Sequence, residues 1–356
     1  MSDGLYLHAA GMVTSVGHTL EDAFTSIHAG IARFRETHLV GLEGRRLLAS
    51  PVMPVSRDHV GLARALALAR PALRECLAGR RDPPPPGRTA LLLCTSRREA
   101  QPAWDGLGGA LAAELDSLGV DVPEALRFQV ERGHAGGMIA LSRARELLDA
   151  ALADECLLAG VDSQCEPDVL QVLDLVGWTK SSRARSGYIP GEAAVVLCLR
   201  AHGPGARIAG WSFAEERAPL EGRPSTGSAL TAAAAHAIDQ WGGAPRALAH
   251  VYADLNGERG RAKEWAMTAS RTLWGEGVQP ELVHPADCVG DLGAAAMPLL
   301  TALAARRLST LRNARERSAT AAQQADAELG AASLVLASSS TALRGAAVVL
   351  GARERE

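Results

Sequence analysis

The chain has 356 residues, of which 47% are hydrophobic, 22% are charged and 4% are aromatic, so it can bury a core and is not intrinsically disordered. Its formal net charge of -3 argues against a nucleic-acid-binding protein, which would carry a basic excess. No apolar run reaches the roughly 18 residues of a membrane span, and the N-terminus lacks the pattern of a signal peptide, so we expect a cytoplasmic protein of one large or two modest domains.

Short apolar runs alternate with helical patterns from the N-terminus onward, which predicts an α/β protein. Leu5–Ala9 is predicted as a buried strand, followed by a helix capped by Thr19. A second helix is predicted over Gly61–Ala78. The prolines of Asp82–Gly87 require a surface loop. Thr89–Cys94 has the continuous apolar character of a strand buried on both faces.

The same alternation continues to the C-terminus. A helix is predicted over Gly136–Ala153, with strands at Glu155–Gly160 and Ala193–Leu199. After a break at His202–Gly205, further strands are predicted at 206–210, 248–252, 334–337 and 346–350, with helices between them. Because the later segments loosely repeat the earlier ones, we expect two similar α/β halves, residues 1–203 and 204–356, with buried mixed sheets packed in layers.

The cysteines indicate neither a disulfide framework nor a metal site. They are Cys76, Cys94, Cys156, Cys165, Cys198 and Cys288. No two of them form a C-x-x-C pair, and no histidine stands at zinc-finger spacing from them. The sequence therefore predicts reduced structural thiols and no metal.

Four segments resemble, in the right order, motifs of one enzyme family. Residues 8–17 (HAAGMVTSVG) resemble the opening T-G-x-G-x-V-T-P-L-G of the condensing enzymes of the thiolase fold, specifically the β-ketoacyl-acyl-carrier-protein synthases. Residues 154–162 resemble the segment ending A-G-G-V-D, residues 187–194 the turn G-x-x-x-G-E-G-A, and residues 293–296 the G-A-A-G after the second catalytic histidine. The resemblance implies a thiolase-like fold. It also implies two-fold dimers, with residues 90–95 and the His134 loop near the interface.

The chemistry of that family needs a cysteine at a helix N-terminus to take the acyl group, and two histidines to stabilise the developing oxyanion. In this chain His134 falls at the cysteine position, Asp254 at the first histidine position and Gly290, with Asp291 beside it, at the second. Pro285 stands where the family has a lysine. The resemblance therefore implies that every catalytic position has changed, and it implies no cofactor.

Two groups are candidates for a replacement nucleophile. His134 could itself accept an acyl group, the alternative being a residue that only starts a helix. Cys288 follows His284 closely, and a cysteine beside a histidine is a nucleophile pattern, although a structural loop cysteine is the other interpretation. Loss of the nucleophile from a catalytic triad costs about 10⁶ in turnover, which favours a protein without condensing activity.

The favoured hypothesis is a non-catalytic β-ketoacyl-synthase-like protein that acts as a binding or scaffold partner. It would work like the chain-length partners of polyketide pathways, or as an accessory component of a bacterial type VI secretion or biosynthetic cluster. The alternative is a divergent β-ketoacyl-acyl-carrier-protein synthase or acyltransferase that uses Cys288 or His134 on an acyl thioester. The expected partners are a second copy or a related synthase, and beyond these an acyl carrier protein or a secretion effector.

An arginine cluster offers a candidate surface for an acidic carrier protein. Its members are Arg306, Arg307, Arg312, Arg315 and Arg317. The alternative interpretation is a solvated helix face whose charge is balanced by Glu316, Asp326 and Glu328.

Overall fold

The computed structural model describes residues 4–53, 55, 59–96, 104–181, 184–218, 223–274, 277–318 and 332–352, without the side chains of 313–318. The elements of the first half are β1 (Leu5–Val13), α1 (Leu20–His28), β2 (Arg35–Val40), β3 (Arg46–Ala49), α2 (Gly61–Ala78), β4 (Thr89–Cys94), α3 (Leu107–Ser117), β5 (Arg127–Val130), α4 (Gly136–Asp149), β6 (Glu155–Ser163), α5 (Pro167–Leu175) and β7 (Glu192–Arg200). Those of the second half are β8 (Ala206–Glu215), α6 (Ser228–Trp241), β9 (Leu248–Ala253), α7 (Arg259–Thr272), β10 (Glu281–Val283), α8 (Ala286–Val289), α9 (Ala296–Ser318), β11 (Ala332–Ser338) and β12 (Leu343–Leu350).

The predicted elements are confirmed, and two of them, α2 and β4, have the predicted bounds. The cap at the start of α1 is also confirmed, because the Thr19 side chain accepts a hydrogen bond from the backbone N–H of Asp22 at 3.1 Å. The α4 helix ends at Asp149, four residues before its predicted end. The strands β2, β3, β5 and β10 were not predicted, because they are short and partly exposed and so lack a continuous apolar run.

The strands repeat one arrangement twice. The order along the main sheet is β10-β9-β11-β12-β8-β1-β7-β6-β4-β5, so each half contributes five strands in equivalent order. In each half the first strand pairs antiparallel with the last, β1 with β7 and β8 with β12. The other three strands form two parallel pairs, in which β4 lies between β5 and β6, and β9 lies between β10 and β11. The helices follow the same repeat, with α2, α3 and α4 in the first half corresponding to α6, α7 and α9 in the second.

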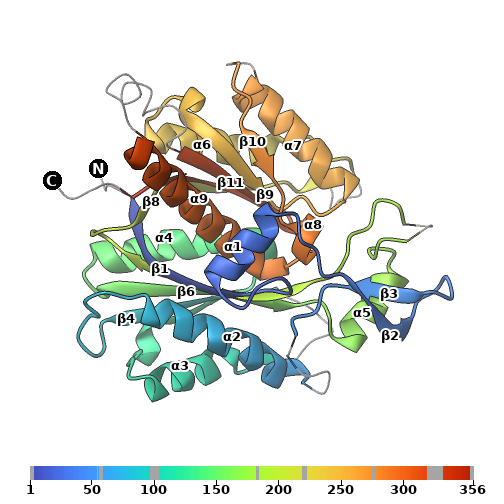
Figure 1. Cartoon of the computed structure of the whole chain (residues 1–356), viewed down its shortest axis with the longest axis horizontal. Coiled ribbons are helices and arrows are strands. Elements are labelled where there is room, and N and C mark those ends of the chain that lie inside the picture. Colours follow the sequence, from blue (N-terminus) through green and yellow to red (C-terminus); the bar gives the residue numbers. More distant parts are fainter. Residues whose placement is uncertain are drawn as a thin grey trace.

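The mixed sheets expected for the two halves are confirmed, and they are joined into one ten-stranded sheet. The strands β1 and β8 pair antiparallel over Leu5–Leu7, which joins the halves edge to edge. The ten-stranded sheet folds back so that α4 and α9 contact strands of both halves. Figure 1 shows the resulting layers, with α6 and α7 on one outer face, α2 and α3 on the other, and α9 and α4 between the half-sheets. The division at residue 203 remains a prediction.

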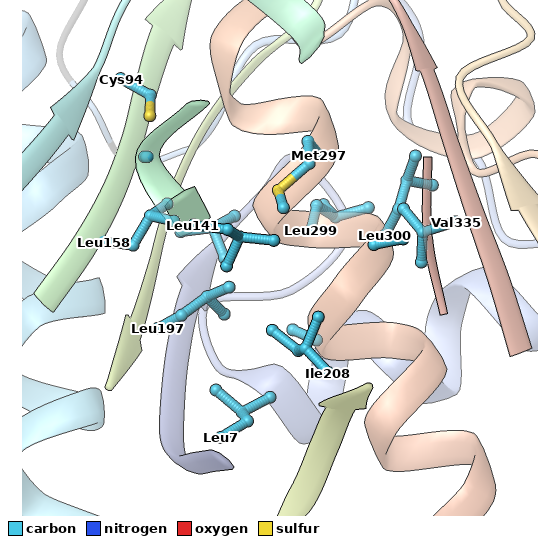
Figure 2. Packing of buried hydrophobic residues seen from close by; sticks show 14 of the residues in the cluster. Leu7, Cys94, Leu141, Leu158, Leu197, Ile208, Met297, Leu299, Leu300 and Val335 are labelled. Atoms are coloured by element: carbon cyan, nitrogen blue, oxygen red, sulfur yellow. The ribbon is translucent and has the colours of Figure 1, made fainter. Parts of the chain in front are cut away.

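The central core lies where the halves meet. It contains Leu141 from α4 and Met297, Leu299 and Leu300 from α9, together with strand residues such as Leu158, Leu197 and Val335. Figure 2 shows these side chains converging from both half-sheets. Because both central helices are buried by strands on either side, their N-termini are held rigidly in the interior.

The expectation that residues 90–95 lie near a dimer interface stays a prediction. The β4 strand, which contains residues 90–94, is hydrogen-bonded to β5 on one side and to β6 on the other. The edge of this half-sheet is β5, which the sequence did not reveal. No helix among the described residues is long and apolar enough to span a membrane.

Candidate functional site

His134 lies at the N-terminus of the central helix α4, as predicted. A single 3-10 turn, η3 (Gly133–Ala135), precedes the helix and begins at Gly133 with φ of 64°. That φ favours glycine, because a side chain there would be strained. The backbone N–H of Ala135 donates to the Ser339 hydroxyl at 3.0 Å. His134 is only 5% exposed, so its imidazole is held inside the protein.

Asp254 follows β9 directly and is buried against Arg261 of α7. The Arg261 Nη1 donates to Asp254 Oδ2 at 2.6 Å, and the Ser338 backbone N–H donates to the same oxygen at 2.7 Å. Arg261 also donates through Nε to Glu258 at 2.7 Å. Burial raises the pKa of Asp254 in spite of these partners. The pKa of Arg261 is raised because its three carboxylate neighbours outweigh the effect of burial.

Gly290 has no side chain to contribute to the site, but its backbone conformation lets the next residue, Asp291, reach the site. Its φ is 74°, and a Cβ there would lie 2.6 Å from the carbonyl oxygen of Ile189. The backbone of Asp291 can then bond on both sides, accepting from Gly191 N–H at 2.9 Å and donating to the Ile189 carbonyl at 2.8 Å. A larger residue at 290 would push this loop away from the core.

The Asp291 carboxylate is the centre of the site. Both of its oxygens lie 2.9 Å from His134 Nε2. It also accepts from Asn256 Nδ2 at 2.6 Å, from the Gly293 N–H at 3.1 Å, and from the Gln164 side-chain amide. Burial alone would raise the pKa of Asp291, but His134, Arg261 and Asn256 together hold it far below its usual range.

These contacts determine the tautomer of His134. Arg261 Nη2 lies 3.2 Å from His134 Nε2 and 3.7 Å from Asp291 Oδ2. Because Nε2 faces two carboxylate oxygens, we assign the proton to this nitrogen, which then donates to Asp291. The opposite nitrogen, Nδ1, is buried without a hydrogen-bond partner among the described residues. His134 is therefore bound at one nitrogen and unpaired at the other.

The space left in the site is small. A cavity of about 20 Å³ remains beside His134, with Asp254, Asn256 and Asp291 on its polar side and Leu299 and Leu300 on its apolar side. Gly290 lines it as well, so the three positions taken from the family resemblance converge on one point. A volume of this size holds about one water molecule.

The structure does not bring Cys288 and His284 together. His284 Nδ1 pairs with Asp287 at 3.0 Å. The Cys288 thiol is directed to the carbonyl oxygen of Ile27 at 3.8 Å, and burial raises its pKa. All six cysteines are free thiols. Among the described residues, no group of three or more His, Cys, Asp or Glu side chains is arranged to hold a metal ion.

The arginine cluster is paired inside the chain. Arg306 binds Glu21 of α1, with Nη2 to Oε2 at 2.8 Å, and its guanidinium lies 5.2 Å from the Phe24 ring centre. Arg307 lies 3.6 Å from Glu281. Arg312 donates to the carbonyl oxygen of Ala352. The side chains of Arg315 and Arg317 lie outside the described part of the structure. So do those of Glu316, Asp326 and Glu328, which were predicted to balance the charge of the cluster.

Sequence reasoning missed most residues of the site. Arg261, Asn256 and Gln164 were not singled out, and Asp291 was noted only as the neighbour of Gly290. The available signal was weak. Asn256 and Glu258 follow the buried strand β9, where polar residues of a site gather, and Arg261 stands three residues after Glu258 on the next helix.

No family model and no curated protein matches this sequence. Solved structures match it over nearly its whole length. The ketosynthase ApeO in complex with its chain length factor ApeC from Xenorhabdus doucetiae matches at TM-score 0.72 and 15% identity, covering 98% of each chain. The fold is therefore that of the ketosynthases.

Two further structures support the same fold. The ishigamide ketosynthase/chain length factor matches at TM-score 0.69 and 16% identity, covering 98% of this chain and 99% of the other. A β-ketoacyl synthase from Burkholderia phymatum matches at TM-score 0.69 and 18% identity, covering 99% and 100%. At these identities the comparison establishes the fold, as the resemblance implied, and leaves the activity to the site.

Proposed function

We propose that this chain is a non-catalytic ketosynthase-like protein that serves as a binding or scaffold partner, in the manner of a chain length factor or an accessory component of a bacterial biosynthetic or secretion cluster. The observation that carries the proposal is the filled site. Asp291 binds His134, Arg261 lies against both, and about 20 Å³ remains free. An acyl thioester needs far more room than one water molecule.

The side chains present are also unsuited to nucleophilic attack. A reactive cysteine needs a lowered pKa and access to solvent, whereas the Cys288 thiol is 5% exposed and burial raises its pKa. His284 is occupied by Asp287. The replacement of the family's cysteine and histidines by His134, Asp254 and Gly290 removes the groups that would take the acyl chain and stabilise the oxyanion.

The structures with the same fold support a partner role. Two of them are described as a ketosynthase with a chain length factor, so chains of this fold assemble with related chains. The proposal carries that behaviour to this chain and expects a dimer with itself or with a related synthase. It does not place a carrier protein on Arg306 and Arg307, because their charges are balanced by Glu21 and Glu281.

One observation favours the alternative, an acyltransferase that uses His134. The Asp291–His134 pair has the arrangement of an oriented imidazole, and His134 Nδ1 has no partner among the described residues. Its burial inside a one-water cavity opposes this function. The two candidates differ in one measurable product, a covalent acyl group on the chain.

The test is the intact mass of the purified protein after incubation with acetyl-, malonyl- and hexanoyl-thioesters of coenzyme A and of an acyl carrier protein. An active β-ketoacyl synthase serves as the positive control. We expect no adduct and no release of CO₂ from the malonyl thioester. An adduct that disappears in Cys288→Ala or His134→Ala would overturn the proposal and identify the nucleophile.

A further inference from the structure

A lobe formed by the β2–β3 hairpin and α5 stands at one side of the layered body (Figure 1). Its surface is unusually apolar. Leu175 is 70% exposed, Leu42 61% and Trp178 45%. With the turn after α5 included, the lobe holds more than half of the exposed large apolar side chains among the described residues, although it is a small part of the chain.

The α5 helix carries apolar side chains on its outer face as well as on its inner face, although Asp168 and Gln171 are also exposed. Val169, Leu170 and Leu173 are buried against the protein, whereas Val172 and Leu175 point outward. Apolar side chains gathered on the exposed face of a helix are typical of a surface that another molecule covers. The described residues cover only the inner side of α5, which leaves its outer side for another molecule.

Asp174 joins the apolar residues into one patch. Its Oδ2 accepts from the backbone N–H of Leu42 at 2.7 Å, and its Oδ1 accepts from the Thr179 hydroxyl at 2.8 Å. One carboxylate thus holds the tip of the hairpin and the turn after α5 together. We call the surface around it the apolar patch. It consists of Leu42, Val172, Leu175, Val176 and Trp178. Contiguous apolar patches of this kind mark interaction sites.

Three cations lie beside the apolar patch. Arg45 and Arg46 follow the hairpin tip, and Lys180 follows Trp178 by two residues. All three are exposed, and none has a side-chain hydrogen bond or ion pair with another residue in the described part of the chain. Of the acids in the lobe, Glu43 at the hairpin tip is partly buried and has a partner of its own, whereas the exposed Glu36 and Asp168 lie at the base of the hairpin and at the opposite end of α5.

We propose that the apolar patch and these three cations bind an acidic amphipathic helix of a second protein, a partner class that rests on the proposed scaffold function. The apolar face of such a helix would cover Leu175 and Trp178, and its acidic flank would pair with the cations. A second copy of this chain is a poor occupant, because a two-fold contact through the same patch would place Arg45, Arg46 and Lys180 against their equivalents.

The probe is a fluorescein-labelled peptide of about 20 residues, long enough to form a helix, with leucines along one face and glutamates along the other. A matched peptide carries lysines in place of the glutamates. Binding to the full chain is followed by fluorescence anisotropy. We expect the acidic peptide to bind at least tenfold more tightly than the basic one, and to weaken as salt is raised.

Variants locate the binding surface. Leu175→Glu and the triple change Arg45→Glu, Arg46→Glu and Lys180→Glu are expected to weaken binding of the acidic peptide at least tenfold. Leu152→Glu and Lys263→Glu alter equally exposed residues elsewhere and serve as controls, with binding unchanged. Equal binding of the two peptides, or no loss in the lobe variants, would overturn the proposal.

Sedimentation of the same variants decides between occupants. A dimer that Leu175→Glu converts to a monomer would assign the apolar patch to a second copy and overturn the proposal. The expected result is that Leu175→Glu leaves the oligomeric state unchanged. The outcome is independent of the thioester experiment, because a covalent adduct would overturn the proposed function without changing where the peptide binds.

Discussion

The two halves of the sheet have the same strand order, yet they bring different chemistry to the place where they meet. In the first half the turn Gly133–Ala135 leads into α4, and in the second half the turn Gly293–Ala295 (η7) leads into α9. Both turns begin at a glycine with positive φ, 64° and 52°. His134 and Ala294 are therefore equivalent. The fold builds two similar helix N-termini, and the side chain at one position decides which of them carries a charged site.

Each helix N-terminus is capped by the other half. The Ala135 N–H donates to Ser339, which follows β11, at 3.0 Å. The Ala294 N–H donates to Asp162 of β6 at 2.8 Å. This exchange satisfies backbone donors that a helix cannot satisfy itself. It also makes the central site depend on both halves.

The halves differ again in whether a helix or a strand supplies the positive charge of a buried ion pair. In the first half Arg64 of α2 binds Glu192 of β7 at 2.7 Å. In the second half Glu264 of α7 binds Arg344 of β12 at 2.6 Å. A helix thus contributes the cation in one half and the anion in the other. The strands β7 and β12 are equivalent, but the helices are not, because α2 corresponds to α6 and not to α7. Each buried charge is neutralised by whichever neighbouring helix reaches it.

The largest effect is expected from removal of the charge at the centre. Asp291→Ala would leave Arg261, His134 and Asn256 without their shared acceptor, and we expect a loss of about 3 to 5 kcal/mol in the free energy of unfolding. Denaturant unfolding measures it. Asp287→Ala, whose side chain is 72% exposed, is the control and should change little. Equal effects of the two variants would show that the Asp291 contacts do not stabilise the fold.

The two buried ion pairs should cost similar amounts when one partner is removed. Arg64→Met and Arg344→Met are each expected to lose about 3 kcal/mol or more, because each leaves a buried carboxylate unpaired. The double change Arg344→Met with Glu264→Leu should be more stable than Arg344→Met alone. A large difference between Arg64→Met and Arg344→Met in chemical denaturation would contradict the expectation that the two buried pairs stabilise the fold equally.

The central helices meet at equivalent residues of opposite size. A Cβ added to Gly137 would lie 2.4 Å from the sulfur of Met297, so the small residue of α4 accommodates the large one of α9. Met297→Ala should cost about 2 to 4 kcal/mol through the cavity that it leaves. Adding Gly137→Ala should recover part of that loss. Strict additivity in a double-mutant cycle would mean that the two residues are not coupled.

Acid should weaken the site through Asp291 and not through Asp254. The pKa of Asp291 is below its unfolded value, so its contribution to stability is complete above about pH 5 and is lost as the pH falls. The raised pKa of Asp254 acts in the opposite sense, because its protonation on acidification favours the folded state. Between pH 5 and pH 3 we expect Asp291→Asn to remove about 1 kcal/mol of the acid-induced loss.

Asp254→Asn provides the matched comparison for that pH profile. It should make the acid-induced loss steeper, since it removes the group whose protonation opposes the loss. Unfolding midpoints of the wild type and both variants across this range measure the difference. Identical profiles for all three proteins would contradict the assignment.

The smallest effect is expected at the exposed pair Arg306–Glu21. Their side chains are 29% and 60% exposed, so water and salt screen the attraction. Arg306→Ala should cost about 1 kcal/mol or less, part of it from the lost contact with Phe24. Thermal unfolding at low and high salt measures this. A loss as large as that of Arg344→Met would show that exposure does not separate the two kinds of pair.

The sequence by itself determined the alternation of strands and helices, the bounds of α2 and β4, and the convergence of positions 134, 254 and 290. Periodicity and turn residues act over a few neighbours, so the sequence shows them directly. The resemblance in motif order then placed the three positions at one point. The joining of the two half-sheets was not predicted, because the pairing of β1 with β8 depends on strands about 200 residues apart in the chain.

Only the tertiary structure decided what occupies that point. Asp291, Arg261 and Gln164 come from a loop, a helix and a strand end that no local pattern connects. The same is true of the pairing of Arg306 with Glu21, and of the separation of Cys288 from His284 despite their closeness in sequence. Side-chain partners are chosen by packing and by the cost of burying an unpaired charge, and both are properties of the folded chain.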